Sequence, residues 1–153
     1  MWWNGERCKM YYFDSRERKN QNIINYFERH KIEYEIKKLD VGDYMSSDNP
    51  NISIDKKFGL SELAGNLCTK DCARFYREVR RAKDNGIKLI FLVESNKIKS
   101  LADVSQWTSK YSKISGSRLQ AEMYRVGIAY NISWEFCSKQ STGKRIVELL
   151  NGK

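Results

Sequence analysis

The chain has 153 residues and a formal net charge of +9, with 28 lysines and arginines against 19 aspartates and glutamates. This length allows one domain with a hydrophobic core and is too short for two domains of ordinary size. The sequence lacks both a run of about 18 apolar residues and an apolar stretch near its start, so we expect no membrane span, no secretory signal and an intracellular location. The positive charge favours a polyanionic partner such as nucleic acid.

The pattern of apolar residues predicts strands and helices in alternation. In chain order, the expected elements are a strand at 10–13, a helix at 20–29, a strand from 34 into 42–44, a strand at 52–56, helices at 60–67 and 72–85, a strand at 87–93, helices at 101–110 and 118–126, a strand at 132–136 and a helix at 142–150. No repeat or Gly/Ser-rich linker divides this order. It predicts one α/β domain over residues 1–153, with a mixed central β-sheet flanked by helices.

Two segments define the sheet further. The stretch 45–51 contains the only proline, Pro50, among serine, aspartate and asparagine residues, so the strands on either side are expected to form a hairpin. The stretch 87–93 is almost continuously apolar. That composition is typical of a central strand that is covered on both faces.

The candidate site combines Asp43 on one hairpin strand with Asp55 and Lys57 on the other. Because residues i and i+2 of a strand point the same way, Asp55 and Lys57 are expected on one face and Lys56 on the opposite face. Two carboxylates suit a hard cation such as Mg²⁺, which keeps several waters and also binds phosphate. A lysine beside the ion can orient a water, so the triplet indicates metal-assisted phosphodiester hydrolysis, with a solvated strand face as the alternative.

Two further polar groups accompany these residues. Asp14, Arg16 and Glu17 follow the first strand, at the end of the strand where α/β folds usually build their sites. The predicted helix at 72–85 carries three arginines on one face, at i, i+3 and i+7: Arg74, Arg77 and Arg81. Such a stripe can hold a phosphate backbone. A solvated loop and an exposed helix face explain the same residues, and the spacing alone leaves both interpretations open.

The cysteines do not favour a metal site. Cys68 and Cys72 have the spacing of half a zinc site, but a second close pair is missing and the only histidine, His30, lies far from both in the sequence. We therefore expect reduced thiols without a metal role. The single histidine also argues against a nuclease that depends on a histidine base.

The motifs together resemble the XPF-type structure-specific nuclease domain family, whose run is Asp-x-Arg-Glu, Gly-Asp-Tyr and Glu-Arg-Lys. The matching residues are Asp14-x-Arg16-Glu17, Gly42-Asp43-Tyr44 and Asp55-Lys56-Lys57, followed by a helix that begins Ser61-Glu62-Leu63. Arg74, with Arg77 or Glu78 after it, resembles the arginine-containing helix that follows the metal site in that family. The resemblance covers residues 9–95 and implies the restriction-endonuclease-like fold of the PD-(D/E)XK superfamily. The compact length resembles stand-alone versions encoded by phages and prophages, which implies the cytoplasm of a bacterial or phage-infected host.

The resemblance implies an endonuclease that uses Mg²⁺ or Mn²⁺ to cut branched, flap or junction DNA in repair or recombination, leaving 5′-phosphate and 3′-hydroxyl ends. Asp43 and Asp55 would hold the ion, with the backbone carbonyl of Lys56 as a third ligand. Lys57 would orient the attacking water and stabilise charge in the transition state. A homodimer is implied because relatives pair.

The remaining site residues receive supporting roles from the same resemblance. Asp14 and Glu17 would line the site, either as outer ligands through water or by positioning Arg16. The residues expected to contact DNA are Lys56, Arg74, Arg77 and Arg81.

The sequence departs from the family pattern at several places. Asp55 and Lys56 stand where the family has glutamate and arginine, which shortens one carboxylate arm and removes a guanidinium fork. The helix that follows is displaced by one residue, so no metal role is assigned to Glu62. Residues 96–153 lie outside the match and are expected to extend the same domain.

Two other functions stay open from the sequence. One is a catalytically inactive DNA-binding module of the same fold. The other is a basic RNA-binding or protein-interaction domain that stacks bases on aromatic side chains. The aromatic residues in question are Trp107, Tyr111, Tyr124 and Trp134. Such residues more often belong to a hydrophobic core, and whether Trp2 and Trp3 belong to the fold is likewise open.

Overall fold

The computed structural model describes residues 9–110 and 112–153, so Trp2, Trp3 and Tyr111 lie outside the described residues. The strands are β1 (Tyr11–Asp14), β2 (Tyr34–Lys37), β3 (Tyr44–Ser46), β4 (Asn49–Lys57), β5 (Lys88–Glu94) and β6 (Ser133–Cys137). The helices are α1 (Gln21–Arg29), α2 (Leu60–Leu67), α3 (Cys72–Asp84), α4 (Gly116–Tyr130) and α5 (Thr142–Leu150), with short 3₁₀ helices η1 (Leu101–Gln106) and η2 (Lys139–Ser141). None of the helices in this part of the chain is both long and apolar enough to cross a bilayer.

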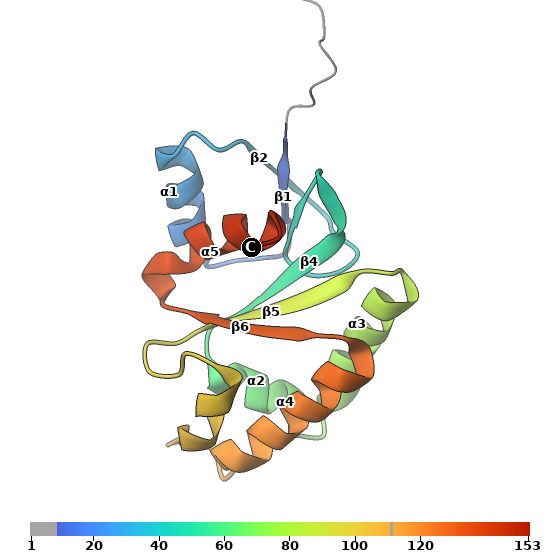
Figure 1. Cartoon of the computed structure of the whole chain (residues 1–153), viewed down its shortest axis with the longest axis vertical. Coiled ribbons are helices and arrows are strands. Elements are labelled where there is room, and N and C mark those ends of the chain that lie inside the picture. Colours follow the sequence, from blue (N-terminus) through green and yellow to red (C-terminus); the bar gives the residue numbers. More distant parts are fainter. Residues whose placement is uncertain (1–8, 111) are drawn as a thin grey trace, which may run out of the picture.

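One six-stranded mixed sheet runs through the molecule in the order β2-β1-β3-β4-β5-β6 (Figure 1). The predicted strand from 34 to 44 is wrong, because it is two strands on opposite sides of β1. Phe13 of β1 pairs with Ile36 of β2 in parallel and with Tyr44 of β3 in antiparallel register. The residues between them carry the chain across the end of β1, anchored by the buried side chains of Leu39 and Val41. The predicted hairpin is confirmed as β3–β4, with Ser46 opposite Asn49.

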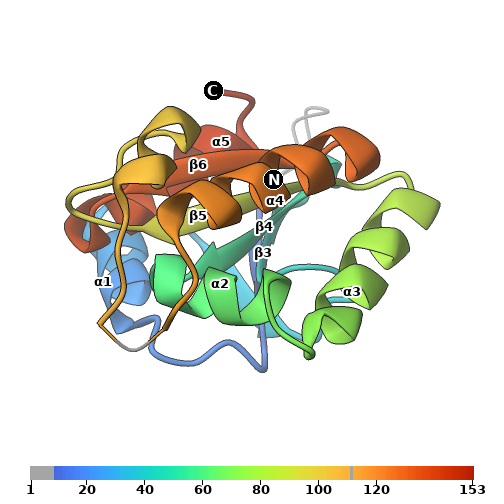
Figure 2. The same cartoon turned by 90° about the horizontal axis from the view of Figure 1, so that it is seen from below.

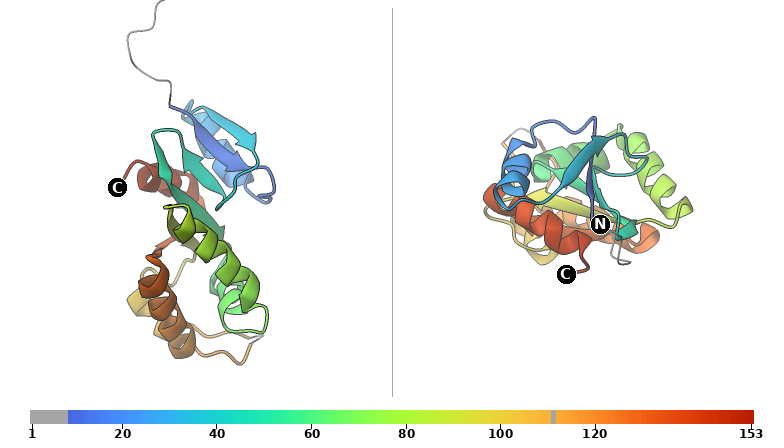
Figure 3. Two further views of the ribbon diagram at one scale, coloured as in Figure 1. Left: turned by 90° about the vertical axis from the view of Figure 1, so that its right-hand side faces the viewer. Right: turned by 90° about the horizontal axis from the view of Figure 1, so that it is seen from above.

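Helices cover both faces of the sheet, α1 and α5 on one side and α2, α3 and α4 on the other (Figures 1 and 2). The prediction of a central strand covered on both faces is confirmed for β5. Leu89, Phe91 and Val93 belong to the core under α2, α3 and α4, whereas Ile90 and Leu92 belong to the core under α1 and α5. Figure 3 shows the two helical layers from the side and from above.

The segment after β5 differs from its prediction. The helix expected at 101–110 is only the 3₁₀ helix η1, in which Leu101 and Val104 point toward the core three residues apart, the repeat of a 3₁₀ helix. Trp107 then turns the backbone to an extended conformation. The next helix, α4, begins at Gly116 rather than at 118, because the Ser115 side chain caps it by accepting a hydrogen bond from the Arg118 N–H.

Candidate functional site

Three aspartates from β1, β4 and the residues before β3 share one face of the sheet. Phe13, Tyr44 and Ile54 point into the core under α1 and α5. Because side chains alternate along a strand, their neighbours Asp14, Asp43 and Asp55 face the opposite side, toward α2 and α3. The pleat of three adjacent strands therefore brings together carboxylates that are far apart in the sequence.

The backbone of Asp43 is fixed between its neighbours. Its N–H donates to the Ile54 carbonyl at 2.7 Å, and its carbonyl accepts from the Asp14 N–H at 2.8 Å. Its side-chain Oδ2 accepts from the Lys56 N–H at 2.9 Å. Gly42, just before it, has φ +72°, and a Cβ there would lie 2.1 Å from the Ser53 Oγ, so this turn requires glycine.

Asp55 and Lys57 lie side by side, as predicted. The Lys57 Nζ is 3.4 Å from the Asp55 Oδ1, and both side chains are largely buried. Burial lowers the pKa of Lys57, but the surrounding carboxylates outweigh burial and leave that pKa raised. The contributing carboxylates are Asp55, Glu62, Glu78 and Asp43. The ammonium therefore stays protonated and faces an excess of negative charge.

The two site aspartates are correspondingly destabilised as anions. Burial, followed by the charge of Glu17, raises the pKa of Asp43 to about 7. Burial and then the charge of Asp43 raise the pKa of Asp55 well above its ordinary value, and a side-chain hydrogen bond with Glu78 adds to this shift. When carboxylates are crowded in this way, their negative charges repel one another, and a bound cation stabilises their ionised form.

These residues fit a partly hydrated divalent ion rather than a closed metal cage. Within residues 9–110 and 112–153, no three His, Cys, Asp or Glu side chains lie close enough together to enclose a metal. Mg²⁺ keeps several waters and is commonly held by one or two carboxylates together with substrate phosphate. Asp43 and Asp55 would supply such a pair.

Glu78 and Glu62 also belong to the site, although the sequence analysis named Glu78 only as a possible companion of Arg74 and gave Glu62 no metal role. Glu78 is on α3, one turn after Arg74, and its carboxylate reaches Asp55. Glu62, in the first turn of α2, accepts a hydrogen bond from the Phe58 N–H at 2.9 Å and acts on the charge of Lys57. The available signal was the i, i+4 spacing of Arg74 and Glu78, which places both on one face of a helix.

Asp14 is engaged by Arg16 and the backbone. The Arg16 Nε and Nη2 donate to the two Asp14 oxygens at 3.0 and 3.2 Å, and the Leu39 N–H donates to Asp14 at 2.8 Å. Of the two roles expected for Asp14, this geometry favours the positioning of Arg16. The Asp14 hydrogen bond raises the pKa of Arg16, whose side chain stays largely exposed at the rim of the site.

Glu17 does not position Arg16 but pairs with Lys56 on the other face of β4. The Lys56 Nζ is 3.7 Å from the Glu17 Oε2, and Glu17 also accepts from the Tyr44 hydroxyl at 3.2 Å. Burial raises the pKa of Glu17, and the charge of Lys56 opposes this shift. The Lys56 side chain has no exposed surface. Lys56 is nevertheless among the residues that line the neighbouring cleft, and contact of its ammonium with DNA stays a prediction.

A cleft of about 1130 Å³ opens between this edge of the sheet, α2 and α3. Asp14, Arg16, Glu17, Asp43, Asp55, Lys57, Arg74, Arg77, Glu78 and Arg81 are among its lining residues. The expected arginine stripe thus lies along one wall, and Arg81 also donates to the Asp40 carbonyl at 3.2 Å. The carboxylates form the floor of the cleft, and arginines of α3 form its side.

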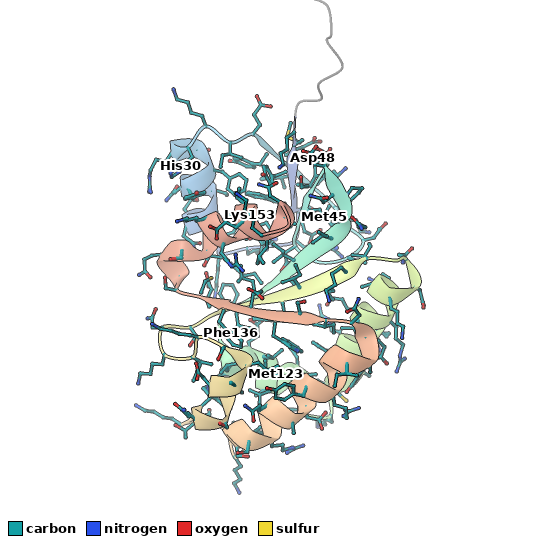
Figure 4. All side chains as sticks on the ribbon, viewed as in Figure 1. His30, Met45, Asp48, Met123, Phe136 and Lys153 are labelled. Carbon is teal, nitrogen blue, oxygen red and sulfur yellow. The ribbon has the colours of Figure 1, made fainter. Side chains whose placement is uncertain are left out.

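Residues considered for other functions lie elsewhere. Trp134 stacks on Phe91 with a ring-centroid distance of 4.9 Å and donates to the Met123 carbonyl, so it belongs to the core. His30 directly follows α1, in the opposite layer from Met123 (Figure 4). Cys68 and Cys72, at the ends of α2 and α3, therefore lie in the layer away from this histidine.

Comparisons with known proteins agree with this architecture. The ERCC4 domain matches residues 13–149. The solved structure of XPF from Aeropyrum pernix superposes with a TM-score of 0.71 at 19% identity, covering 93% of this chain and 63% of that one. A structure of the same protein in complex with DNA gives the same values. The chain thus spans less than two thirds of that XPF chain. A comparison with curated protein sequences gives no match. The predicted restriction-endonuclease-like α/β fold is confirmed.

Proposed function

The chain belongs to the ERCC4 domain family, that of XPF-type nuclease domains, and on this premise we propose that it hydrolyses phosphodiester bonds in DNA with the aid of a divalent cation. The observation that carries the proposal is the placement of Asp43, Asp55 and Lys57 on one face of the sheet, in a cleft with an arginine-bearing wall. The carboxylates on the floor of the cleft suit a metal ion, and the arginines on its wall suit a phosphate beside that ion.

Asp43 and Asp55 would hold Mg²⁺ or Mn²⁺. The N–H and C=O of one strand residue point to the same edge of the strand. The Lys56 N–H donates to Asp43, so the Lys56 carbonyl also points toward Asp43. This direction supports the Lys56 carbonyl as a third ligand. Such an ion, when bound, polarises the phosphate and lowers the pKa of a bound water. The buried position of Asp55 and the backbone hydrogen bonds of Asp43 fix the backbone from which both carboxylates reach the cleft.

Lys57 would orient the attacking water and stabilise the charge that develops on the phosphate. Its pKa is raised, so the ammonium keeps its protons and acts as a donor rather than as a base. The contact with Asp55 at 3.4 Å holds the ammonium at the metal side of the cleft. A fixed positive group beside the reacting phosphate is worth more in this enclosed setting than in water.

The arginines on α3, namely Arg74, Arg77 and Arg81, would track the phosphates of the bound strand. Arg16, held by Asp14, adds a fourth guanidinium at the opposite rim. We further propose branched, flap or junction DNA as the substrate and a homodimer as the assembly, both on the basis of the family.

The test is cleavage of a panel of labelled flap, fork, four-way-junction and linear DNAs with Mg²⁺, with Mn²⁺ and with EDTA. We expect products with 5′-phosphate and 3′-hydroxyl ends that require the cation, and none from the Asp55→Asn protein. Tight binding of every DNA without any product would instead identify a catalytically inactive DNA-binding module. Equal or tighter binding of RNA would favour the RNA-binding alternative.

A further inference from the structure

A second, smaller hollow opens beside the catalytic cleft and has a different chemistry. Its volume is about 340 Å³, and its lining residues are Phe58, Gly59, Leu60, Ser61, Glu62, Glu94, Ser95 and Trp107. Phe58 and Glu62 also line the larger cleft, so the two spaces adjoin. Among the described residues that line the hollow, none is a lysine or an arginine. The hollow therefore does not suit a phosphate.

Phe58 and Trp107 make the hollow suitable for a flat apolar group. Phe58 follows directly after the catalytic Lys57 and is 46% exposed, which is unusual for a phenylalanine. The ammonium groups of Lys56 and Lys19 lie 4.4 and 5.8 Å from its ring centroid and hold the ring in place. Trp107 is half-buried and lines the same hollow from the end of η1.

The segments that contain Ser95 and Trp107 are rich in exposed lysines. Four exposed lysines lie within six residues of Ser95 or Trp107 in the sequence: Lys97, Lys99, Lys110 and Lys113. A nucleic-acid strand needs this combination, since its bases stack on aromatic rings and its phosphates bind lysines. Trp107 and the four lysines belong to the region after β5, and Phe58 directly follows β4.

We propose that this hollow binds an unpaired base of the DNA substrate, next to the phosphate held in the catalytic cleft, by stacking on Phe58 and Trp107. This inference rests on the proposed nuclease function and deepens it. A paired base is not free to enter, and taking it out of a duplex costs several kcal/mol, whereas a base in a flap or at a junction is already free. The hollow would thus select DNA with unpaired nucleotides beside the cut.

The test compares a flap DNA with a fully paired duplex of equal length, bound by proteins in the Asp55→Asn background so that no cutting interferes. Phe58→Ala should weaken flap binding about tenfold, as expected for the loss of one base–aromatic stack, and leave duplex binding within about twofold. Phe58→Tyr keeps the ring and should bind the flap as before. The matched control is Tyr124→Ala, which removes an aromatic side chain of similar exposure, 47%, on α4, and should change neither affinity.

A second readout reports the base itself. With 2-aminopurine as the first unpaired nucleotide, the fluorescence should fall when the Asp55→Asn protein binds and should stay unchanged with the added Phe58→Ala substitution. Equal losses on flap and duplex, or an equal effect of Tyr124→Ala, would overturn the inference. If wild-type protein cuts the flap while Phe58→Ala binds it normally, the nuclease proposal stands and this one fails. If wild-type protein cuts nothing while Phe58→Ala selectively loses flap binding, the base-binding proposal stands and the nuclease proposal fails.

Discussion

The end of β4 presents two neighbouring lysines to opposite faces of the sheet, and their surroundings differ. Lys57 faces the open cleft, with Asp55 at 3.4 Å and further carboxylates beyond it. Lys56 faces the α1 side, where its ammonium is enclosed, pairs with Glu17 at 3.7 Å and donates to the Lys19 carbonyl at 3.3 Å. The open face carries unbalanced negative charge, and the closed face carries the buried Lys56–Glu17 ion pair, whose two residues also border the cleft.

The two neighbouring lysines are therefore expected to have different roles, Lys57 in function and Lys56 in stability. On the closed face each polar group finds a protein partner, which holds the loop after β1 against β4. On the open face, burial and then the charge of a neighbouring carboxylate raise the pKa values of Asp43 and Asp55. Perturbed carboxylates in a cleft are typical of functional sites. Substitutions on the two faces should therefore have opposite kinds of effect.

Lys57→Ala should show the largest effect, and the effect should be on catalysis. Loss of one fixed charge-stabilising group typically lowers a rate constant by about 10²- to 10³-fold. DNA affinity should change little, because the arginines of α3 remain. Single-turnover cleavage and fluorescence anisotropy measure the two quantities. A Lys57→Ala protein that cuts at the wild-type rate would rule out the role assigned to this lysine.

Lys56→Ala should instead affect stability. Removing one partner of a buried ion pair leaves Glu17 without compensation, at a cost of about 3 kcal/mol in the free energy of unfolding. Urea denaturation measures this. The double variant Lys56→Met with Glu17→Gln should recover part of the loss, since neither charge is then left alone. A Lys56→Ala protein as stable as wild type would rule out the structural role assigned to this lysine.

The pH dependence of stability should report the open face. Because the pKa of Asp43 is raised to about 7, the folded protein binds this proton more tightly than the unfolded chain does. The resulting stabilisation is present below the unfolded pKa of about 3.9 and is lost as the pH rises through about 7. Without metal, the protein should be less stable at pH 8 than at pH 5. We expect a difference of about 1–2 kcal/mol, smaller than full burial would give, because Asp43 borders an open cleft.

Mg²⁺ should reverse this trend if Asp43 is a ligand. Thermal unfolding followed at both pH values should show stabilisation by Mg²⁺ at pH 8 and little at pH 5, where the carboxyl is protonated. Asp43→Asn should flatten the pH profile and abolish the response to Mg²⁺. The same Mg²⁺ response in Asp43→Asn as in wild type would exclude Asp43 as a ligand.

The comparison also shows which parts of the site the sequence could predict. The opposite directions of Lys56 and Lys57 follow from the pleat of one strand, which is a local property, and they were predicted correctly. Asp55 was predicted beside Lys57 because both lie on β4, but the carboxylates that come from other elements were not predicted. Glu78 reaches Asp55 from α3, and Glu17 reaches Lys56 from the loop after β1. For the same reason the split of the predicted strand at 34–44 around β1 was missed, since strand pairing depends on contacts between distant segments.

The smallest expected effect is on the free energy of unfolding, and it is tested by replacing one glycine in each helical layer. A Cβ at Gly65 of α2, on the wall of the cleft, would meet no atom within 4 Å, whereas a Cβ at Gly143 of α5 would lie 2.6 Å from the Tyr26 Cβ. Alanine favours a helix over glycine by about 0.5–1 kcal/mol, so Gly65→Ala should stabilise the protein by about that amount. Gly143→Ala gains the same helix propensity but overpacks the closed face, and should lose about 1–3 kcal/mol.

Urea denaturation of these two variants, followed by DNA binding of Gly65→Ala, completes the comparison. If DNA passes close to the cleft wall, the added methyl group should weaken binding by a few-fold even though the fold is more stable. A change that strengthens the fold and weakens the complex cannot arise from partial unfolding, so it would place DNA against α2. Stability that falls in Gly65→Ala as it does in Gly143→Ala would show instead that the two layers are packed alike.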